Sequence, residues 1–146
     1  MAARSLVKAI DELWSAEEDL SGLIAGGLWL SRVPAIQDKP FCAFFILSGR
    51  APQYMFDTAT ETNKRIENPV VQFSIYDHSS AADDVLLYAD KLKAKFDHAT
   101  LVYTELSEIT HAGCQRYNYG FLVKDPDGPW HFTVDYHIIY QEAFSF

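Results

Sequence analysis

Apolar residues recur at intervals of three and four in two stretches of the chain. Near the N-terminus the series runs through Leu6, Ile10, Leu13 and Trp14. This spacing predicts an amphipathic helix, and Ser5 stands where a capping residue would begin it. A short second turn is expected after the acidic residues 17–19, and residues 26–27, both glycine, would end it.

The second helical stretch follows residues 79–80. Ser80 and Asp83 have the spacing of a capping box, and acidic side chains at 83–84 suit the positive end of a helix. The apolar stripe consists of Val85, Leu86, Ala89, Leu92 and Phe96. A helix with such a stripe has to cover a sheet or another helix, so it is expected to pack on the strands.

Strand patterns occupy most of the remaining chain. Residues 28–30 read as extended chain, and residues 41–47 form an apolar run that predicts a buried strand ended by residues 48–49. Residues 53–58 alternate, with Tyr54 and Phe56 on one face and Met55 on the other. Residues 70–77 give the clearest alternation. The polar residues 58–69 between these strands predict a loop.

The last third of the chain predicts a long hairpin. Residues 115–123 and 130–140 flank Asp125-Pro126-Asp127-Gly128, in which proline and glycine suit the dihedral angles of a tight turn. In the final strand, alternation places two sets of side chains on opposite faces. The apolar face holds Trp130, Phe132, Val134, Tyr136, Ile138 and Tyr140, and the other holds His131, Thr133, Asp135, His137 and Ile139.

These elements predict a single α+β domain over residues 1–146. Strands that follow one another with separate helices favour a mostly antiparallel sheet of about four to five strands, with two helices packed on one face. A chain of 146 residues with 49% hydrophobic and 14% aromatic residues has enough apolar surface for a core without disulfides.

The net charge and the cysteines disfavour two classes of function, nucleic-acid binding and metal binding through cysteine. The net charge of −8 and the scattered basic residues disfavour a protein that grips nucleic acid, although an acidic wall would let DNA slide past. Cys42 and Cys114 lack metal-site spacing and are expected to be reduced thiols, with Cys42 inside an apolar strand. No signal-peptide pattern precedes Lys8, so synthesis in the cytosol is expected.

The strongest candidate for chemistry is the set His131, Asp135 and His137 on one strand face. Histidine and aspartate at such spacing could orient one another or hold a metal ion. The alternative is that a half-buried strand simply carries polar residues on its solvent side. Motifs of hydrolases, kinases, dinucleotide-binding proteins and zinc proteases are missing from the sequence. We therefore expect no enzyme activity, no metal and no cofactor.

Aromatic and basic residues outside the predicted core suggest contacts with other chains. Phe144 and Phe146 end the sequence, where two exposed phenylalanines are unusual unless they fold back or dock on a neighbour. The polar stretch around residues 63–68 has arginines near it. The candidate interface residues are Arg50, Tyr54, Phe56, Arg65, Phe144 and Phe146.

Five segments in this order resemble the tail completion family of tailed phages and prophages, the head–tail joining proteins also called tail terminators or minor tail proteins. The first two are residues 26–30, GGLWL, and residues 40–45, which enter a strand through Pro-Phe. Residues 71–77, VQFSIYD, and 96–101, FDHATL, follow. The last is the turn at 125–128 with the strand 130–136 after it. The resemblance covers nearly the whole chain.

The resemblance implies a structural subunit of a ring, expected to be a hexamer, that caps the tail tube and joins it to the head connector. Its implied partners are copies of itself, the tail tube protein and connector or neck proteins. DNA would pass through the ring without specific binding. The implied location is the virion tail or neck, assembled in the host bacterial cytoplasm, without a membrane. The alternatives are a neck or head-completion protein, or a small-molecule-binding domain or enzyme that uses His131, Asp135 and His137.

Overall fold

A computed structural model gives the structure of residues 2–31, 40–57, 62–79, 81–101, 109–126 and 128–144. The helical elements are α1 (Ala2–Ser15), a 3-10 turn (Ala16–Glu18) and α2 (Asp83–Phe96). The strands are β1 (Leu28–Leu30), β2 (Phe41–Asp57), β3 (Thr62–Asp77), β4 (Thr100–Leu101), β5 (Ile109–Arg116), β6 (Phe121–Lys124) and β7 (Trp130–Phe144).

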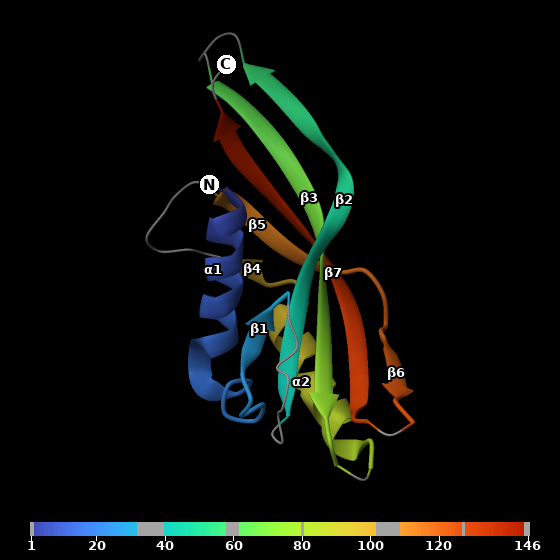
Figure 1. Cartoon of the computed structure of the whole chain (residues 1–146). Coiled ribbons are helices and arrows are strands. Elements are labelled where there is room, and N and C mark those ends of the chain that lie inside the picture. Colours follow the sequence, from blue (N-terminus) through green and yellow to red (C-terminus); the bar gives the residue numbers. More distant parts are fainter. Residues whose placement is uncertain are drawn as a thin grey trace.

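The strands form one curled sheet in the order β1-β2-β3-β7-β5-β4, and β6 pairs with the basal end of β7 (Figure 1). This arrangement confirms the α+β class. The expected four to five strands were too few, because seven strands join this sheet within the described residues. The sheet is also mixed, since β1 runs parallel to β2 while the other pairs are antiparallel.

Two strands are far longer than the sequence pattern predicted. The expected end at residues 48–49 was wrong, because β2 continues to Asp57 through two register shifts against β3. The expected loop at 58–69 was wrong over residues 62–69, which belong to β3 and pair with both β2 and β7. Residues 65–69 are only partly buried, which suits their polar side chains, and the backbone of residues 62–68 pairs with both neighbouring strands.

Gly49 lies where the backbone of β2 passes close to the backbone of β3. A Cβ atom at this position would lie 1.7 Å from the Asn68 carbonyl oxygen, so only glycine fits. The sequence suggested that this glycine stops the strand. In the structure it lies at the first register shift, between Leu47 and Arg50.

Both predicted helices exist, but their starts differ from the expected caps. Helix α1 begins at Ala2, and Ser5 is a buried residue inside it. Helix α2 begins at Asp83 with Ala82 in the N-cap position and without a side-chain cap. The Ser79 hydroxyl instead lies 2.7 Å from both the Asp77 carboxylate and the Ala81 carbonyl before the helix, and its one hydrogen is donated to these acceptors. The partner in the expected capping box, Ser80, lies outside the described residues.

The predicted turn of the C-terminal hairpin is confirmed, but the predicted strand before that turn is wrong. β6 and β7 pair across the turn after Lys124, whereas residues 115–123 do not form one strand. β5 ends at Arg116, and the chain crosses to β6 through Gly120, whose φ is +95°. A Cβ atom there would lie 2.4 Å from the Phe132 ring. Glycine therefore satisfies both the backbone angle and the space.

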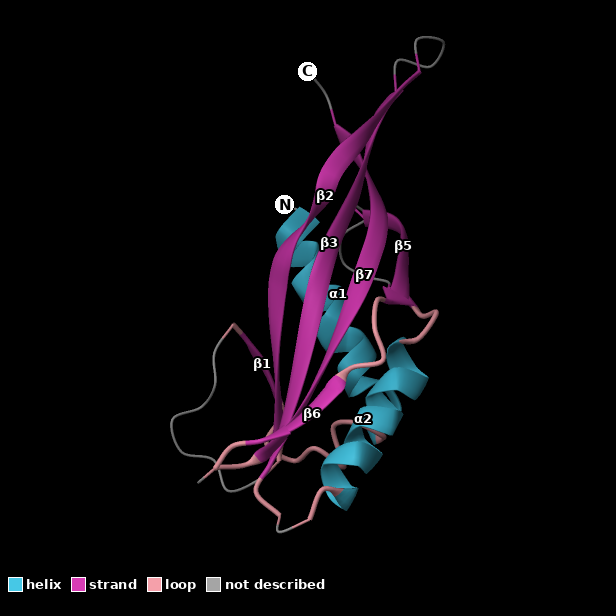
Figure 2. Cartoon of the chain, turned by 90° about the vertical axis from the view of Figure 1, so that its right-hand side faces the viewer, coloured by secondary structure: helices cyan, strands magenta, loops and turns pink. Residues whose placement is uncertain are grey.

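The hydrophobic core lies between the two helices and one face of the sheet. Alternation in β7 is confirmed, since Phe132, Val134, Tyr136, Ile138 and Tyr140 are all buried. They continue the same face as Cys42 and Phe44 of β2 and Val71, Phe73 and Ile75 of β3. Figure 2 shows α1 and α2 on one side of the sheet. The expected packing of both helices on one face is confirmed.

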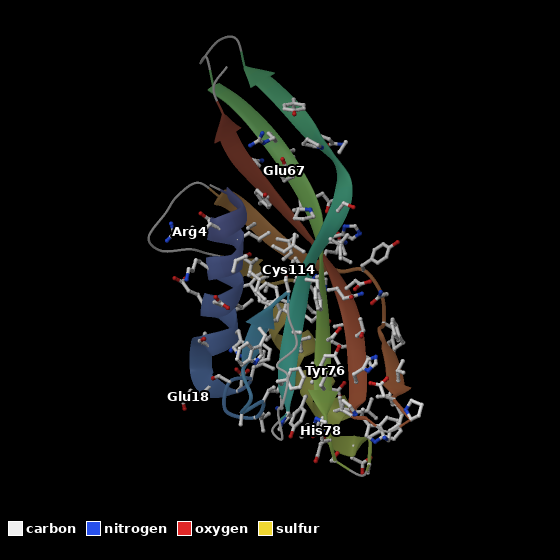
Figure 3. The ribbon with its side chains drawn as sticks, viewed as in Figure 1. Arg4, Glu18, Glu67, Tyr76, His78 and Cys114 are labelled. Carbon is white, nitrogen blue, oxygen red and sulfur yellow. The ribbon has the colours of Figure 1, made fainter. Side chains whose placement is uncertain are left out.

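The sheet extends well beyond the helices. We call residues 50–57, 62–68 and 139–144 of β2, β3 and β7 the arm, and the helix-covered remainder the body (Figures 1 and 2). Figure 3 places Glu67 in the arm, Cys114 within the body, and Tyr76 near the basal end of the sheet. The N-terminal end of α1 points toward the arm, and the arm ends in the C-terminal part of β7.

Candidate functional site

The predicted interface residues gather in the arm. In β2, Arg50 lies opposite Asn68, and Tyr54 lies opposite Arg65. Phe56 and Phe144 both pair with Asn63, from β2 and β7 respectively. Of the six predicted residues, the structure thus brings five to one end of the sheet. The sixth, Phe146, lies outside the described residues.

Tyr54 lies on the face of the sheet that the helices cover in the body but not in the arm. β3 runs in unbroken register with β7, so Arg65 and Glu67 continue the face that buries Phe73 in the body. No helix among the described residues covers that face in the arm (Figure 2). Tyr54 is 52% exposed there, and the Arg65 guanidinium is 3.2 Å from the Glu67 carboxylate. The arm therefore presents an aromatic residue and an ion pair where the body presents its core.

The opposite face of the arm has a hollow of about 230 Å³. It lies where β2 changes register against β3, and its lining is Ala51, Gln53, Ile66, Asn68 and Ile139. None of these five side chains titrates near neutral pH. The hollow can receive an apolar or amide group of a partner, and its described lining residues include no acid, base or nucleophile for a reaction.

His131, Asp135 and His137 share one face of β7, as predicted, but each has its own partners. His137 Nδ1 lies 3.0 Å from the Asn68 amide oxygen, and the Tyr117 ring meets the His137 ring edge-on at 4.7 Å. The Asn118 amide donates to Asp135 at 3.1 Å, and its oxygen accepts from the Asp135 backbone N–H. Asp135 and His137 thereby hold the segment after β5 against β7.

His131 belongs to a third environment near the basal end. Its ring lies 5.2 Å from the Tyr76 ring, which stacks on Phe41 at 4.8 Å. The His131 Nδ1 atom is 3.7 Å from the Asp125 carboxylate, too long for a hydrogen bond. Within the described residues, no group of three His, Cys, Asp or Glu side chains is placed to hold a metal ion. The three residues therefore do not converge on one point.

Two other polar side chains are buried beside the core without forming a reactive site. The Tyr136 hydroxyl donates to Asp97 at 2.7 Å, and the Arg116 guanidinium lies 3.3 Å from the same carboxylate. Burial and then the Asp97 bond raise the pKa of Tyr136 well above its usual value. The Lys93 ammonium lies 3.9 Å from the Tyr119 ring centre, and burial lowers its pKa.

The cysteines are confirmed as free thiols, and both are buried. Burial raises the pKa of Cys114 to about 12 and that of Cys42 further still. Since the thiolate is the reactive form, neither cysteine is activated as a nucleophile. Their role is packing in β2 and β5.

A second exposed surface, which the sequence analysis did not single out, lies on β6 and the chain leading into it. We call Tyr117, Tyr119, Phe121 and Leu122 the β6 cluster. Their exposed fractions are 64%, 77%, 54% and 37%. The signal in the sequence was the spacing of aromatic residues in YNYGF, but the expected continuous strand assigned them to an ordinary hairpin. Tyrosines and phenylalanines exposed in this way are typical of protein interfaces.

The fold is similar to that of a chain in a known particle structure. The match is to a chain in the virion of a native gene transfer agent particle, with a TM-score of 0.60 and 9% identity. It covers 89% of this chain and 90% of the other. No family model and no curated protein sequence matches the chain. Among the described residues, no helix is both long and apolar enough to cross a membrane. At this identity, the match shows that the two chains share a fold.

Proposed function

We propose that this chain is a structural protein of a phage-like virion, and specifically a subunit of the ring that caps the tail tube and joins it to the head connector. The similar chain comes from a gene transfer agent virion, and the match extends over nearly all of both chains. The family resemblance in the sequence points to the same class of particle. The ring, the tube contact and the connector contact are the specific parts of this proposal.

The observation that carries the proposal is the presence of two exposed surfaces at different places in one subunit. The arm surface contains Tyr54 and Arg65, and the β6 cluster lies on β6, beside the start of β7, and on the chain that leads into β6 from β5 (Figure 1). A ring needs head-to-tail contacts, in which one surface of a subunit meets a different surface of the next. Two distinct aromatic surfaces meet that requirement, whereas a two-fold dimer needs only one.

The enzyme alternative receives less support from the geometry. His131, Asp135 and His137 are each engaged with a different neighbour, and the hollow in the arm is lined by groups without acid–base chemistry. A structural role accounts for the polar face through the contacts that fix the Tyr117–Asn118 segment. The proposal accordingly includes neither catalysis nor a bound metal.

Particle labelling tests the proposal. An epitope tag on this chain, with particles purified from the bacterium that encodes it, should place antibody label at the junction of head and tail. The purified chain should also associate with the tail tube protein encoded near it. Label on the head side of the connector would instead identify a neck or head-completion protein. Particles without label, together with no binding to the tube protein, would reject the structural function.

The His137→Ala variant separates the structural function from the alternative enzyme or small-molecule-binding domain. The structural function predicts a metal content equal to that of a buffer blank in both the native chain and the variant. Bound metal in the native chain that disappears in this variant would favour the metal-dependent alternative.

A further inference from the structure

The hollow in the arm has the size and the lining of a site for one aromatic side chain. Its volume is about 230 Å³, and a protein cavity of about 150 Å³ is enough to hold benzene. Pockets for small molecules are generally larger, at about 300–1,000 Å³. Ala51, Ile66 and Ile139 supply apolar walls, while Gln53 and Asn68 supply amides. A phenol, with an apolar ring and one hydroxyl, matches this lining.

Both parts of the lining are accessible to a partner. Ile139 is 39% exposed, and Ala51 and Gln53 are exposed as well. The Asn68 amide oxygen lies against His137, whereas the Gln53 side chain forms no hydrogen bond within the described part of the chain. Covering Ile139 and giving the Gln53 amide a partner would both favour binding.

Tyr119 is the most exposed residue of the β6 cluster, at 77%, and its backbone is fixed on both sides. The Asn118 side chain before it bonds twice to Asp135, and Gly120 after it has a φ of +95°. The Lys93 ammonium supports the ring itself, at 3.9 Å from the ring centre. A side chain that is already ordered loses less conformational entropy when it binds.

The other residues of the β6 cluster fit the hollow less well. The Tyr117 ring is held edge-on against His137, at 4.7 Å between the ring centres. Phe121 and Leu122 have no hydroxyl to meet an amide. Tyr119 combines a projecting ring with a hydroxyl, so it is the side chain of the cluster that matches the lining.

A subunit cannot place its own Tyr119 in its own hollow. The Tyr119 ring lies against Lys93 of α2, on the face of the sheet that the helices cover, whereas the hollow lies on the opposite face. Phe121, two residues after Tyr119, pairs with Thr133, which is six residues of β7 or about 20 Å from Ile139. The aromatic group that fills the hollow therefore comes from another molecule.

Charge favours a second copy of this chain as that molecule. The chain has a net charge of −8, but residues 109–124 around Tyr119 contain two basic side chains and no Asp or Glu. Lys93, which forms no ion pair within the described residues, adds a further positive charge beneath the ring. This positive region is attracted to the acidic remainder of another copy. Residues 40–56 beside the hollow also contain no Asp or Glu, so the contact desolvates no carboxylate from them.

We propose that the hollow of one copy receives the Tyr119 ring of a second copy, with the tyrosine hydroxyl hydrogen-bonded to the Gln53 amide. Each copy then offers one ring and one hollow. Because these two sites differ and lie on opposite faces of the sheet, the contact is head-to-tail and can close into a ring of subunits. This inference rests on the proposed ring and identifies the contact between its subunits.

Photo-crosslinking tests the contact directly. A variant with p-azidophenylalanine in place of Tyr119 is mixed with native chain labelled with a heavy nitrogen isotope. Illumination should attach the probe to labelled peptides that contain residues 51–53 or Ile139. The matched control carries the same probe in place of Tyr117 and should not attach there. Attachment elsewhere on the second copy or to tube protein in particles, or no attachment in both concentrated protein and particles, would overturn the contact.

Variants of the labelled chain test whether the hollow is the receiving site. Ala51→Trp fills the hollow, and attachment of the probe should fall at least about tenfold. Ala51→Ser changes the same exposed residue without filling the hollow and is the control for folding. A labelled Tyr119→Ala chain, which keeps its hollow, should accept the probe as well as the native chain does. Undiminished attachment to Ala51→Trp, or none to Tyr119→Ala, would contradict the proposed head-to-tail contact.

Competition tests the hydrogen bond to Gln53. Unlabelled native chain should reduce attachment of the probe, and Tyr119→Phe should compete about three- to tenfold less well, because it keeps the ring but lacks the hydroxyl. Against labelled Gln53→Leu chain the two competitors should be equal. A difference that persists with Gln53→Leu would assign the hydroxyl to another partner.

The outcomes separate this inference from the proposed function. Antibody label at the head–tail junction, combined with no attachment at the hollow, leaves a ring subunit whose copies meet in another way. Attachment at the hollow without label in particles, and without binding to tube protein, leaves a self-assembling chain that is not part of a tail. Each result therefore rejects one proposal independently of the other.

Discussion

The body and the arm are made from the same three strands, yet they have opposite surfaces. In the body, one face of β2, β3 and β7 is covered by α1 and α2, and Phe73 is fully buried among Phe44, Phe96 and Tyr136. In the arm, the same face carries Tyr54, which is 52% exposed, and the half-buried ion pair of Arg65 with Glu67, although Tyr140 at the base of the arm is still buried. Coverage by helices, and not a change in strand structure, makes one half a core and the other a surface.

This difference indicates that the body contributes most to stability and that the arm carries exposed side chains. Burial of aromatic side chains in the body supplies most of the folding free energy, at roughly 25 cal/mol per Å² of apolar surface. The arm is held together by the backbone ladders that join β3 to β2 and β7. Mutations in the two halves should therefore act on different measurements.

Removing one ring from each half should give the largest contrast. Phe73→Ala should lower the free energy of unfolding by about 3–5 kcal/mol, because it removes a buried ring and leaves a cavity. Tyr54→Ala should change it by less than about 0.5 kcal/mol, as is usual for exposed sites. Urea unfolding of both variants measures the difference. Equal losses would show that the arm is part of the folding core.

The buried hydroxyl of Tyr136 should give the next largest effect. Tyr136→Phe keeps the ring but removes the bond to Asp97, and it should lower stability by about 1.5–3 kcal/mol, the range for a hydrogen bond to a charged group. The control is Tyr117→Phe, at a residue that is 64% exposed, and its effect should stay below about 0.5 kcal/mol. Thermal and urea unfolding of the two variants provide the test. A neutral Tyr136→Phe would mean that Asp97 is satisfied by Arg116 alone.

A substitution at Gly49 tests whether the close approach of β2 and β3 is required where the body meets the arm. Gly49→Ala should cost about 1–3 kcal/mol, because the added carbon collides with the Asn68 backbone. Gly113→Ala in β5 is the matched control, since a Cβ atom there meets nothing within 4 Å and its φ is not positive. Hydrogen exchange should show faster exchange of arm amides in the Gly49 variant. Unchanged arm amides would show that the close approach at this glycine is not required.

The ion pair of Asp19 with Lys95 should give the smallest effect. The Lys95 ammonium holds the pKa of Asp19 below its ordinary value of 3.8. A lowered carboxyl pKa gives stability that is present above the ordinary value and is lost as pH falls through the lowered one. Asp19→Asn should therefore lose about 0.3–1 kcal/mol at neutral pH, and this difference should vanish in strong acid. A difference that stays constant as the pH falls from neutral into strong acid, well below the lowered pKa of Asp19, would contradict the role of charge.

Much of the body could be predicted from local sequence patterns. The apolar spacing in α1 and α2 and the alternation in β7 identified buried faces correctly, because those faces repeat with the period of the element. Strand length in the arm could not be predicted in this way. Residues 62–69 are polar and lack a core face, and their strand structure depends on pairing with β2 and β7, distant partners that local patterns do not reveal.

The candidate surfaces also combine features that the local sequence predicted with features that depend on long-range strand pairing. Aromatic and basic residues such as Tyr54 and Arg65 stood out because the predicted core did not use them. Their meeting in one arm depended on the β2–β3 register. The β6 cluster was missed because an aromatic alternation such as YNYGF is equally typical of a half-buried strand. The proposed set His131, Asp135 and His137 shared a face, as predicted, but side-chain partners from β3, the β6–β7 turn and the segment before β6 separated their roles.

By itself, the sequence determined the α+β class, the two amphipathic helices, the buried face of the last strand and an acidic chain without a catalytic motif. These properties are local or compositional, so neighbouring residues are enough to define them. Tertiary structure alone decided how far the sheet extends past the helices and which strands lie next to one another in it. Both depend on long-range strand pairing, because a strand's backbone groups are satisfied by partners that are distant in the sequence.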